Sequence, residues 1–169
     1  MTHDRGSSPL SRLVRIDRIR KDGNEVVVEA TQAECAALAE DFKIPAIREL
    51  VGRFRADGPS SRLVVTGTVS AIVTQVCTVT LDPFESKVQE PVEIAYTDTD
   101  ILVGTDAEDA DVPDPIVGNR IDFGALTAEF LALGLDPYPR KPGVAFTPVT
   151  DGEEDGPLGE LRRLRQPDG

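Results

Sequence analysis

The chain has 169 residues, of which 40% are hydrophobic and 5% aromatic, and this is enough apolar surface for one aliphatic core. Its 30 acidic and 18 basic residues give a formal net charge of −12, which excludes a uniformly basic nucleic-acid coat, so any contact with RNA must be local. No apolar run approaches the roughly 20 residues of a membrane span, and the first residues lack the apolar stretch of a signal peptide. We therefore expect a cytoplasmic protein that makes no membrane contact.

The supply of cysteine and histidine limits the possible chemistry. Cys35 and Cys77 lie in segments with different predicted structure, and in a cytoplasmic chain they have no reason to pair. His3 is the only histidine, and we expect its N-terminal tail to be disordered, so a Ser-His-Asp triad has no candidate base. A structural zinc site usually takes four Cys or His ligands, which this chain does not supply. We expect no cofactor, no metal site and no catalytic residue.

Residues 1–22 carry an excess of basic residues and end in a turn signal. The turn is Asp22-Gly23-Asn24, and the β-rich residues 25–29 follow it. This pattern predicts two strands joined by a tight turn.

A helix is predicted next, over residues 32–42. Thr31 and Glu34 have the spacing of a capping box, and apolar residues follow at helical intervals. Pro45 prevents the helix from continuing. Residues 46–56 fit either a second helix or a strand, and the alternation around Phe54 favours the strand.

The strongest pattern in the chain is the period-two alternation of apolar and Thr or Ser residues over residues 62–81. It predicts a long bent strand, or two strands broken near Gly67 or Ser70. We expect a turn at Asp82-Pro83-Phe84 and a second strand to residue 96, which together give a long antiparallel hairpin. Pro91 cannot donate to a ladder, so we place it at a sheet edge or a bulge.

Residues 97–118 contain seven acidic residues and no Lys or Arg, a composition typical of a disordered acidic linker. Asp122 can then cap a helix with an apolar stripe of Phe123, Leu126, Phe130 and Leu133, which ends at Gly134. We expect this helix to pack against the sheet.

Three prolines in residues 137–142 predict an extended path for the next segment. Two roles remain open for it. It could be a structural strap over the sheet, or it could present Tyr138 for stacking and Arg140 and Lys141 to phosphate. Further on, leucines at 158, 161 and 164 suggest a short amphipathic helix.

The predicted fold class is therefore α+β. We expect an antiparallel sheet with the hairpin of residues 62–96 at its centre and two to three packed helices. Residues 1–150 form one domain that includes the linker at 97–118, and residues 151–169 form a tail.

Cys77 has the parity of the apolar residues in its strand, which indicates a small buried hydrophobe. No Lys, Arg or His adjoins it in the sequence to lower the thiol pKa, so a nucleophilic role is not indicated.

The order of the segments resembles the YceD family, the large ribosomal RNA subunit accumulation proteins. The segments are PLSRLVRIDRI, EATQAECAALAEDFKIPAI, VTGTVSAIVTQVCTVTLDPF, the acidic linker, IDFGALTAEFLALGLDPYPRKPG and a final Leu-rich basic stretch. The PYPRKPG form is similar to the alphaproteobacterial branch. The residues that carry the likeness most specifically are Gly67, Gln75, Cys77, Leu81, Pro83, Phe84, Pro137, Pro139, Pro142 and Gly143.

The resemblance implies a bacterial, non-enzymatic factor that supports synthesis, processing or stability of the large-subunit (23S) rRNA. Many members have C-x-x-C where this chain has Cys77 and Thr80, and some have further Cys or His residues near residues 137–143. This chain has neither, so any metal or redox chemistry of those relatives is not retained through these positions.

Two binding partners fit this function, precursor rRNA or an early large-subunit ribosomal protein. The acidic body favours a basic ribosomal protein. RNA would have to use local cations, which are those of the N-terminal basic stretch, Arg140, Lys141 and the C-terminal arginines. The candidate contact residues are Arg12, Arg15, Arg18, Arg53, Arg55, Tyr138, Arg140, Lys141, Arg162, Arg163 and Arg165.

Two other classes of function remain. A small-molecule binding domain would show a deep apolar cavity with converging polar groups. An RNA-processing hydrolase would need a carboxylate cluster, whereas the acids concentrate in low-complexity segments. The oligomeric state is left open.

Overall fold

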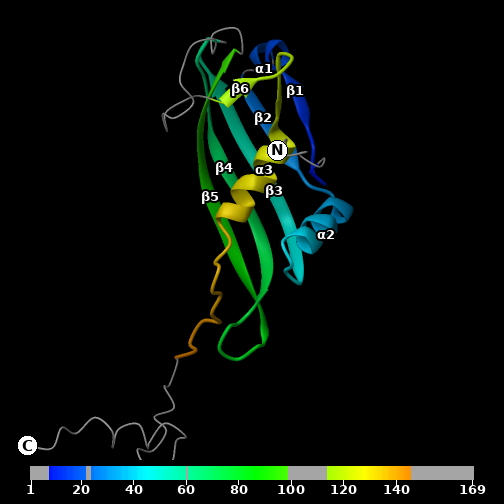
Figure 1. The fold of residues 1–169 in the computed structure, drawn as a ribbon, viewed down its shortest axis with the longest axis vertical. Coiled ribbons are helices and arrows are strands. Elements are labelled where there is room, and N and C mark those ends of the chain that lie inside the picture. Colours follow the sequence, from blue (N-terminus) through cyan, green and yellow to red (C-terminus); the bar gives the residue numbers. More distant parts are fainter. Residues whose placement is uncertain (1–7, 22–23, 60, 99–113, 146–169) are drawn as a thin grey trace, which may run out of the picture.

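The computed structural model describes residues 8–21, 24–59, 61–98 and 114–145 (Figure 1). Strands and helices are mixed along the chain, which confirms the α+β class. The elements are β1 (Leu13–Arg15), α1 (Ile16–Lys21), β2 (Glu25–Glu29), α2 (Gln32–Asp41), β3 (Ala46–Asp57), β4 (Leu63–Val76), β5 (Pro83–Asp98), β6 (Asp114–Ile116), β7 (Arg120–Asp122) and α3 (Phe123–Leu133). In this part of the chain no helix is both long enough and apolar enough to cross a membrane.

The main sheet has five strands in the order β2-β3-β4-β5-β6, and β1 pairs separately with β7. The prediction of a purely antiparallel sheet is wrong, because β6 runs parallel to β5, with Tyr96 opposite Asp114. A parallel pair needs a much longer connection than a hairpin turn, and fifteen residues separate Asp98 of β5 from Asp114 of β6 in the sequence. The ends of the predicted acidic linker therefore belong to strands. Residues 99–113 and the predicted tail at 151–169 lie outside the described residues.

β4 and β5 pair antiparallel from Leu63 and Tyr96 to Val76 and Pro83. β4 is one strand of 14 residues, so neither predicted break occurs. The turn lies earlier than predicted, over residues 77–82, and it is closed by hydrogen bonds in which the N–H of Cys77 donates to Asp82 O and the N–H of Leu81 donates to Cys77 O, both at 2.9 Å. Pro91 lies opposite Thr68. In the described part of the chain the other side of β5 is paired only from Tyr96 to Asp98, so Pro91 is at an edge position.

Gly67 permits the close pairing of β3 with β4. A Cβ atom at this position would lie 2.1 Å from the backbone oxygen of Arg53, well inside van der Waals contact. The glycine in the middle of β4 therefore allows the backbones of β3 and β4 to approach closely, and it does not mark a break in the strand.

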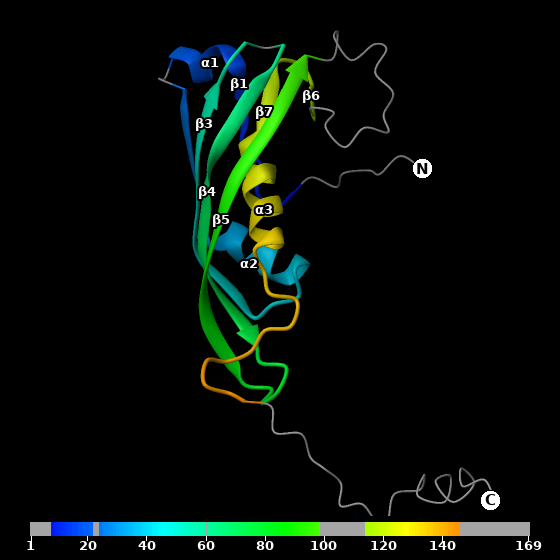
Figure 2. The same ribbon diagram turned by 90° about the vertical axis from the view of Figure 1, so that its left-hand side faces the viewer.

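One face of the sheet is covered by α2 and α3 (Figure 2). Val65, Val69 and Val73 alternate along β4 on this face and are fully buried. α3 packs against β2, β3, β4 and β5, and the ring of Phe123 lies 5.3 Å from that of Phe54. On the opposite face, which we call the open face, Arg53, Arg55, Thr66 and the side chains beside them on that face are exposed or half-buried.

The predicted helices at 32–42 and 122–134 and the strand at 46–56 are confirmed. The stripe on α3 differs in one position, because Leu133 is 68% exposed and Leu131 is buried instead. The predicted hairpin at the N-terminus is wrong. Residues 16–21 form α1, and β1 pairs with β7. Ile16 and Ile19 are both buried, and helical spacing puts them on one face.

The start of α2 is fixed by the predicted capping box. The N–H of Glu34 donates to Thr31 Oγ1 at 3.3 Å, and the N–H of Thr31 donates to Glu34 Oε2 at 2.8 Å. Arg12 adds an ion pair to the same carboxylate at 2.8 Å. The Arg12 side chain, followed by the hydrogen bonds from Thr31, lowers the pKa of Glu34 from 4.5 to about 2 against a smaller effect of burial.

Replacing Gly67 with Ala should lower the free energy of unfolding by about 1–3 kcal/mol, because β3 and β4 must move apart to admit the methyl group. Urea unfolding of Gly67→Ala beside Ser70→Ala, a control on the open face of the same strand, measures this. Equal stability of the two variants would show that the strands tolerate the extra atom.

The Glu34→Gln variant should be less stable than the wild type by about 1–2 kcal/mol at neutral pH. The folded-state pKa is depressed, so the contribution of Glu34 is fully present above about pH 4.5 and is lost as the pH falls toward 2. Urea unfolding between pH 7 and 3 should show the difference shrinking on acidification. A difference that stays constant with pH, or one shared by the exposed control Glu40→Gln, would contradict the role of this carboxylate.

Candidate nucleic-acid interface

Residues 135–144, which we call the strap, follow α3 and cross the turn between β4 and β5. Gln75 Nε2 donates to Asp136 O at 3.0 Å, and the N–H of Thr78 donates to Pro139 O at 2.8 Å. The N–H of Lys141 donates to Cys77 Sγ at 3.4 Å. These hydrogen bonds join two segments about 60 residues apart and fix the path of the strap.

The thiol of Cys77 lies beneath the strap with no exposed surface, and both cysteines are free. The backbone N–H of Lys141, then the hydroxyl and N–H of Thr80, lower the pKa of Cys77 to about 6, with burial opposing them. This shift is not visible in the sequence, because its causes are backbone N–H groups and the Thr80 hydroxyl rather than a neighbouring cation. Since the strap covers the sulfur, the structure supports the interpretation of Cys77 as a packed residue.

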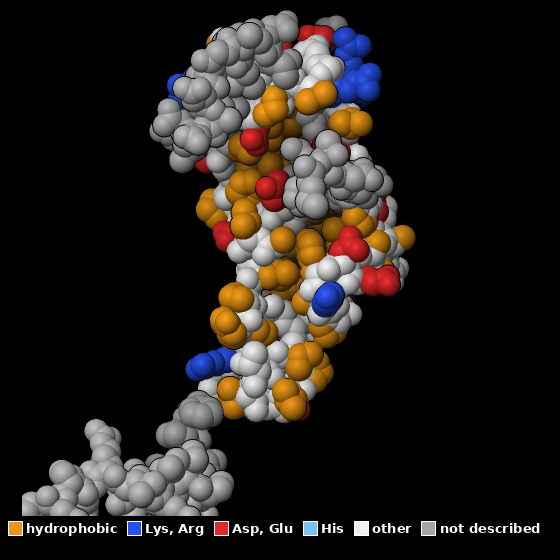
Figure 3. Space-filling view, viewed as in Figure 1, with side chains coloured by type: hydrophobic (Ala, Val, Ile, Leu, Met, Phe, Trp, Pro, Cys, Tyr) orange, Lys and Arg blue, Asp and Glu red, His pale blue; other side chains and the backbone are white. Residues whose placement is uncertain are grey.

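The strap and the turn together form one end of the molecule, which we call the hairpin end. Apolar side chains project from it, and Leu81 (75% exposed) and Tyr138 (73% exposed) are the most accessible. Figure 3 shows apolar side chains at this end of the molecule. Arg140 and Lys141 are exposed on the strap beside Tyr138. Tyr138 and the two cations are thus on one segment that hydrogen bonds hold against the hairpin.

The residues that carry the family likeness are brought together by this arrangement. All of them except Gly67 belong to the end of β4, the turn, the start of β5 or the strap. Gln75 and Cys77 are buried and bind the strap directly, whereas Leu81 is exposed. Their proximity at the hairpin end cannot be predicted from the sequence, because it depends on the path that α3 and the strap take along the sheet to the turn between β4 and β5 (Figure 2).

The remaining predicted cations do not form one basic patch. Arg12 is paired with Glu34 at the start of α2. Arg53 and Arg55 lie on the open face, where Arg55 Nε contacts Asp57 at 2.9 Å. Arg162, Arg163 and Arg165 lie outside the described residues.

Arg15 of β1 and Arg18 of α1 line a hollow. Figure 1 shows these two elements at the end of the molecule remote from the strap. The same hollow contains Arg120 of β7, a residue that the sequence analysis missed. Nothing local marks Arg120, because its place beside Arg15 follows from the pairing of two short strands more than 100 residues apart.

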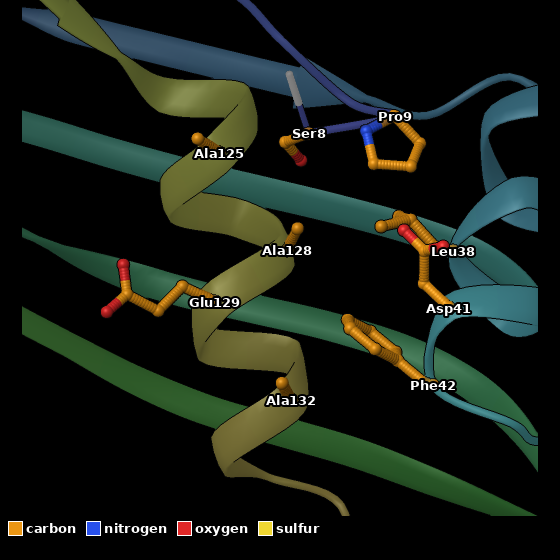
Figure 4. Close-up of a pocket in the computed structure, with 9 residues that line it drawn as sticks. All are labelled: Ser8, Pro9, Leu38, Asp41, Phe42, Ala125, Ala128, Glu129 and Ala132. Carbon is orange, nitrogen blue, oxygen red and sulfur yellow. The ribbon is translucent and has the colours of Figure 1, made fainter. Parts of the chain in front are cut away.

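A second hollow of about 490 Å³ lies between α2 and α3 (Figure 4). Ala125, Ala128 and Ala132 line it from α3, and Leu38 and Phe42 line it from the other side. The Glu129 side chain points away from α2 (Figure 4). Glu129 therefore does not converge with Asp41, which lines the hollow from α2, as the polar groups of a typical small-molecule site do.

Among the residues that the structure describes, no group of three or more His, Cys, Asp or Glu residues is placed to hold a metal ion.

No curated protein and no solved structure matches the chain. The family model described as "Large ribosomal RNA subunit accumulation protein YceD" matches residues 65–160, a little more than half of the chain. That range contains the end of β4, the turn and the strap, and the family is described as an accumulation factor rather than as an enzyme. The chain therefore belongs to the YceD family of large ribosomal RNA subunit accumulation proteins.

Proposed function

We propose that this chain is a non-enzymatic factor in large-subunit biogenesis that binds unpaired segments of precursor 23S rRNA at the hairpin end. Its family gives it a role in the accumulation of large-subunit rRNA. The observation that carries the proposal is Tyr138, an exposed aromatic ring on a rigid strap with Arg140 and Lys141 beside it.

The strap suits the stacking of bases because its backbone is already restricted, so binding costs little conformational entropy. Pro137 and Pro139 flank Tyr138 and restrict its backbone, and the N–H of Tyr138 donates to Asp136 Oδ1 at 2.9 Å. A base that stacks on such a ring gains about 1–3 kcal/mol. Arg140 and Lys141 are then within two or three residues of the ring, where they can contact the adjoining phosphates.

The net charge of −12 is compatible with this local contact. At physiological salt, exposed charges more than about 8 Å apart are largely screened from one another. The RNA at the hairpin end therefore responds mainly to the charges of the strap and turn, and much less to carboxylates on remote strands.

A ribosomal protein is the second candidate partner, and a specific observation favours it. Val76, Val79 and Leu81 are aliphatic, exposed and close to one another in sequence at the hairpin end. Aliphatic groups contribute to protein interfaces but offer no flat face to a base. The acidic chain would also attract the basic proteins of the large subunit.

Changing Tyr138 to Ala should weaken binding of single-stranded 23S rRNA fragments about 5- to 150-fold, the range that corresponds to one lost stacking contact. Tyr138→Phe is the matched control, because it keeps the aromatic face. Fluorescence anisotropy titrations of labelled RNA measure both variants. Equal affinities for Tyr138→Ala and wild type would contradict stacking at this position.

The double variant Arg140→Gln, Lys141→Gln should lower the slope of log K against log salt by about 1.4, which is two phosphate contacts at about 0.7 each. Arg62→Gln, at the other end of β4, should leave the slope unchanged. If RNA binding is unaffected while Leu81→Ser abolishes capture of a purified large-subunit protein, the protein partner is correct and the RNA contact is not.

A further inference from the structure

A second group of cations gathers at the end of the molecule remote from the strap. A hollow of about 450 Å³ contains Arg15 of β1, Arg18 of α1 and Arg120 of β7, with Glu25 of β2 as the one carboxylate in its lining. Val14 and Val26 contribute apolar surface. The residues that line the hollow therefore include three guanidinium groups and one carboxylate, in a chain whose overall charge is strongly negative.

The pairing of β1 with β7 places two of these cations directly opposite each other. Arg15 and Arg120 are cross-strand partners, so their Cβ atoms are about 4.5–5.5 Å apart on the same side of the ribbon. Like charges in this position destabilise a strand pair. The β1–β7 ribbon has only three residue pairs, and one of them places two arginines opposite each other. The pairing of the strands does not require this repulsion.

The neighbouring carboxylates offset this repulsion only weakly. Arg15 Nη2 lies 3.2 Å from Asp17 Oδ2, and both side chains are more than half exposed, a setting in which ion pairs contribute little. Asp17 also accepts a hydrogen bond from Asn119 Nδ2 at 3.0 Å. Glu25 Oε1 lies 4.0 Å from Nη1 of Arg55 on the adjacent strand.

We propose that this hollow, which we call the arginine hollow, is a second RNA contact in which Arg15, Arg18 and Arg120 bind the phosphodiester backbone. Guanidinium groups bind phosphate oxygens in bidentate geometry. A phosphate between Arg15 and Arg120 would attract both side chains and offset the repulsion between them. The inference rests on the proposed function, because it requires an RNA partner.

The two contacts are far enough apart to engage separate parts of one RNA. Glu25 is in register with Thr66 through Arg55, and ten residues of β4 separate Thr66 from Val76 at the hairpin end. At about 3.3 Å per residue this is roughly 33 Å. A long transcript that reaches both contacts should therefore bind more tightly than a short one, through the high effective concentration of the second contact.

The decisive variant is the full chain with Arg15→Gln and Arg120→Gln. With a long 23S rRNA transcript as the probe, its slope of log K against log salt should fall by about 1.4–1.8, the value for two phosphate contacts. Lys87→Gln on the open face of β5 is the control, and its slope should match the wild type. Arg18→Gln, which leaves the β1–β7 ribbon intact, should lower the slope by about 0.7–0.9.

A stability measurement separates this role from a structural one. Arg120→Gln should raise Tm by about 1–3 °C at low salt, because it removes the like-charge pair, and the gain should disappear at 1 M salt. A fall in Tm at low salt would show that Arg120 serves the fold, and would overturn the inference.

The remaining outcomes separate the two proposals and the two sources of phosphate. Unchanged slopes for the hollow variants, with weakened binding by Tyr138→Ala, would overturn the arginine hollow and leave the hairpin end standing. Unchanged binding in both sets would overturn both. If inorganic phosphate raises the Tm of the wild type but not of Arg15→Gln, Arg120→Gln, and the RNA slope is unchanged, the hollow is a free-anion site and the RNA contact is wrong.

Discussion

The carboxylate of Asp122 is the point at which the N-terminal segment, β7 and α3 are joined. Its Oδ1 accepts hydrogen bonds from the N–H groups of Gly124 and Ala125, both at 3.0 Å, and from that of Arg12 at 2.7 Å. The Ser11 hydroxyl donates to Oδ2 at 2.6 Å. Burial alone would raise the pKa of Asp122, but these hydrogen bonds outweigh it and lower the pKa. One side chain thus starts α3 and holds β1 beside β7, and both candidate surfaces depend on that arrangement.

From this junction the fold extends toward two ends. α3 runs along the covered face of the sheet and delivers the strap to the turn between β4 and β5 (Figure 2), where Gln75 and Cys77 hold it. In the other direction, the β1–β7 ribbon brings Arg15 and Arg120 together. The buried residues of the long strands serve as a stiff spacer, and the side chains proposed to meet RNA lie where the regular structure ends. Binding side chains placed on the loops and ends of a rigid scaffold are a common arrangement.

Local sequence patterns predict the helices and strands whose formation depends mainly on residues close together in the sequence. The capping box of Thr31 and Glu34, the Asp122 cap and the alternation along β4 each describe a short stretch, and each prediction of an element there is confirmed. Residues 13–21 were misassigned because burial of Ile16 and Ile19 favours a helix over the turn signal that follows them. The parallel β6, the lowered pKa of Cys77 and the pairing of Arg15 with Arg120 arise from contacts between distant segments, which a single sequence does not display.

The central claim is direct contact between this protein and the large-subunit rRNA. Ultraviolet crosslinking of the tagged chain in its native cells, with sequencing of the bound RNA and mass spectrometry of the bound proteins and crosslinked peptides from the same sample, tests it most directly. We expect enrichment of 23S rRNA, with crosslinked peptides from the strap around Tyr138. Large-subunit ribosomal proteins recovered without crosslinked RNA would contradict direct binding and support the protein partner instead.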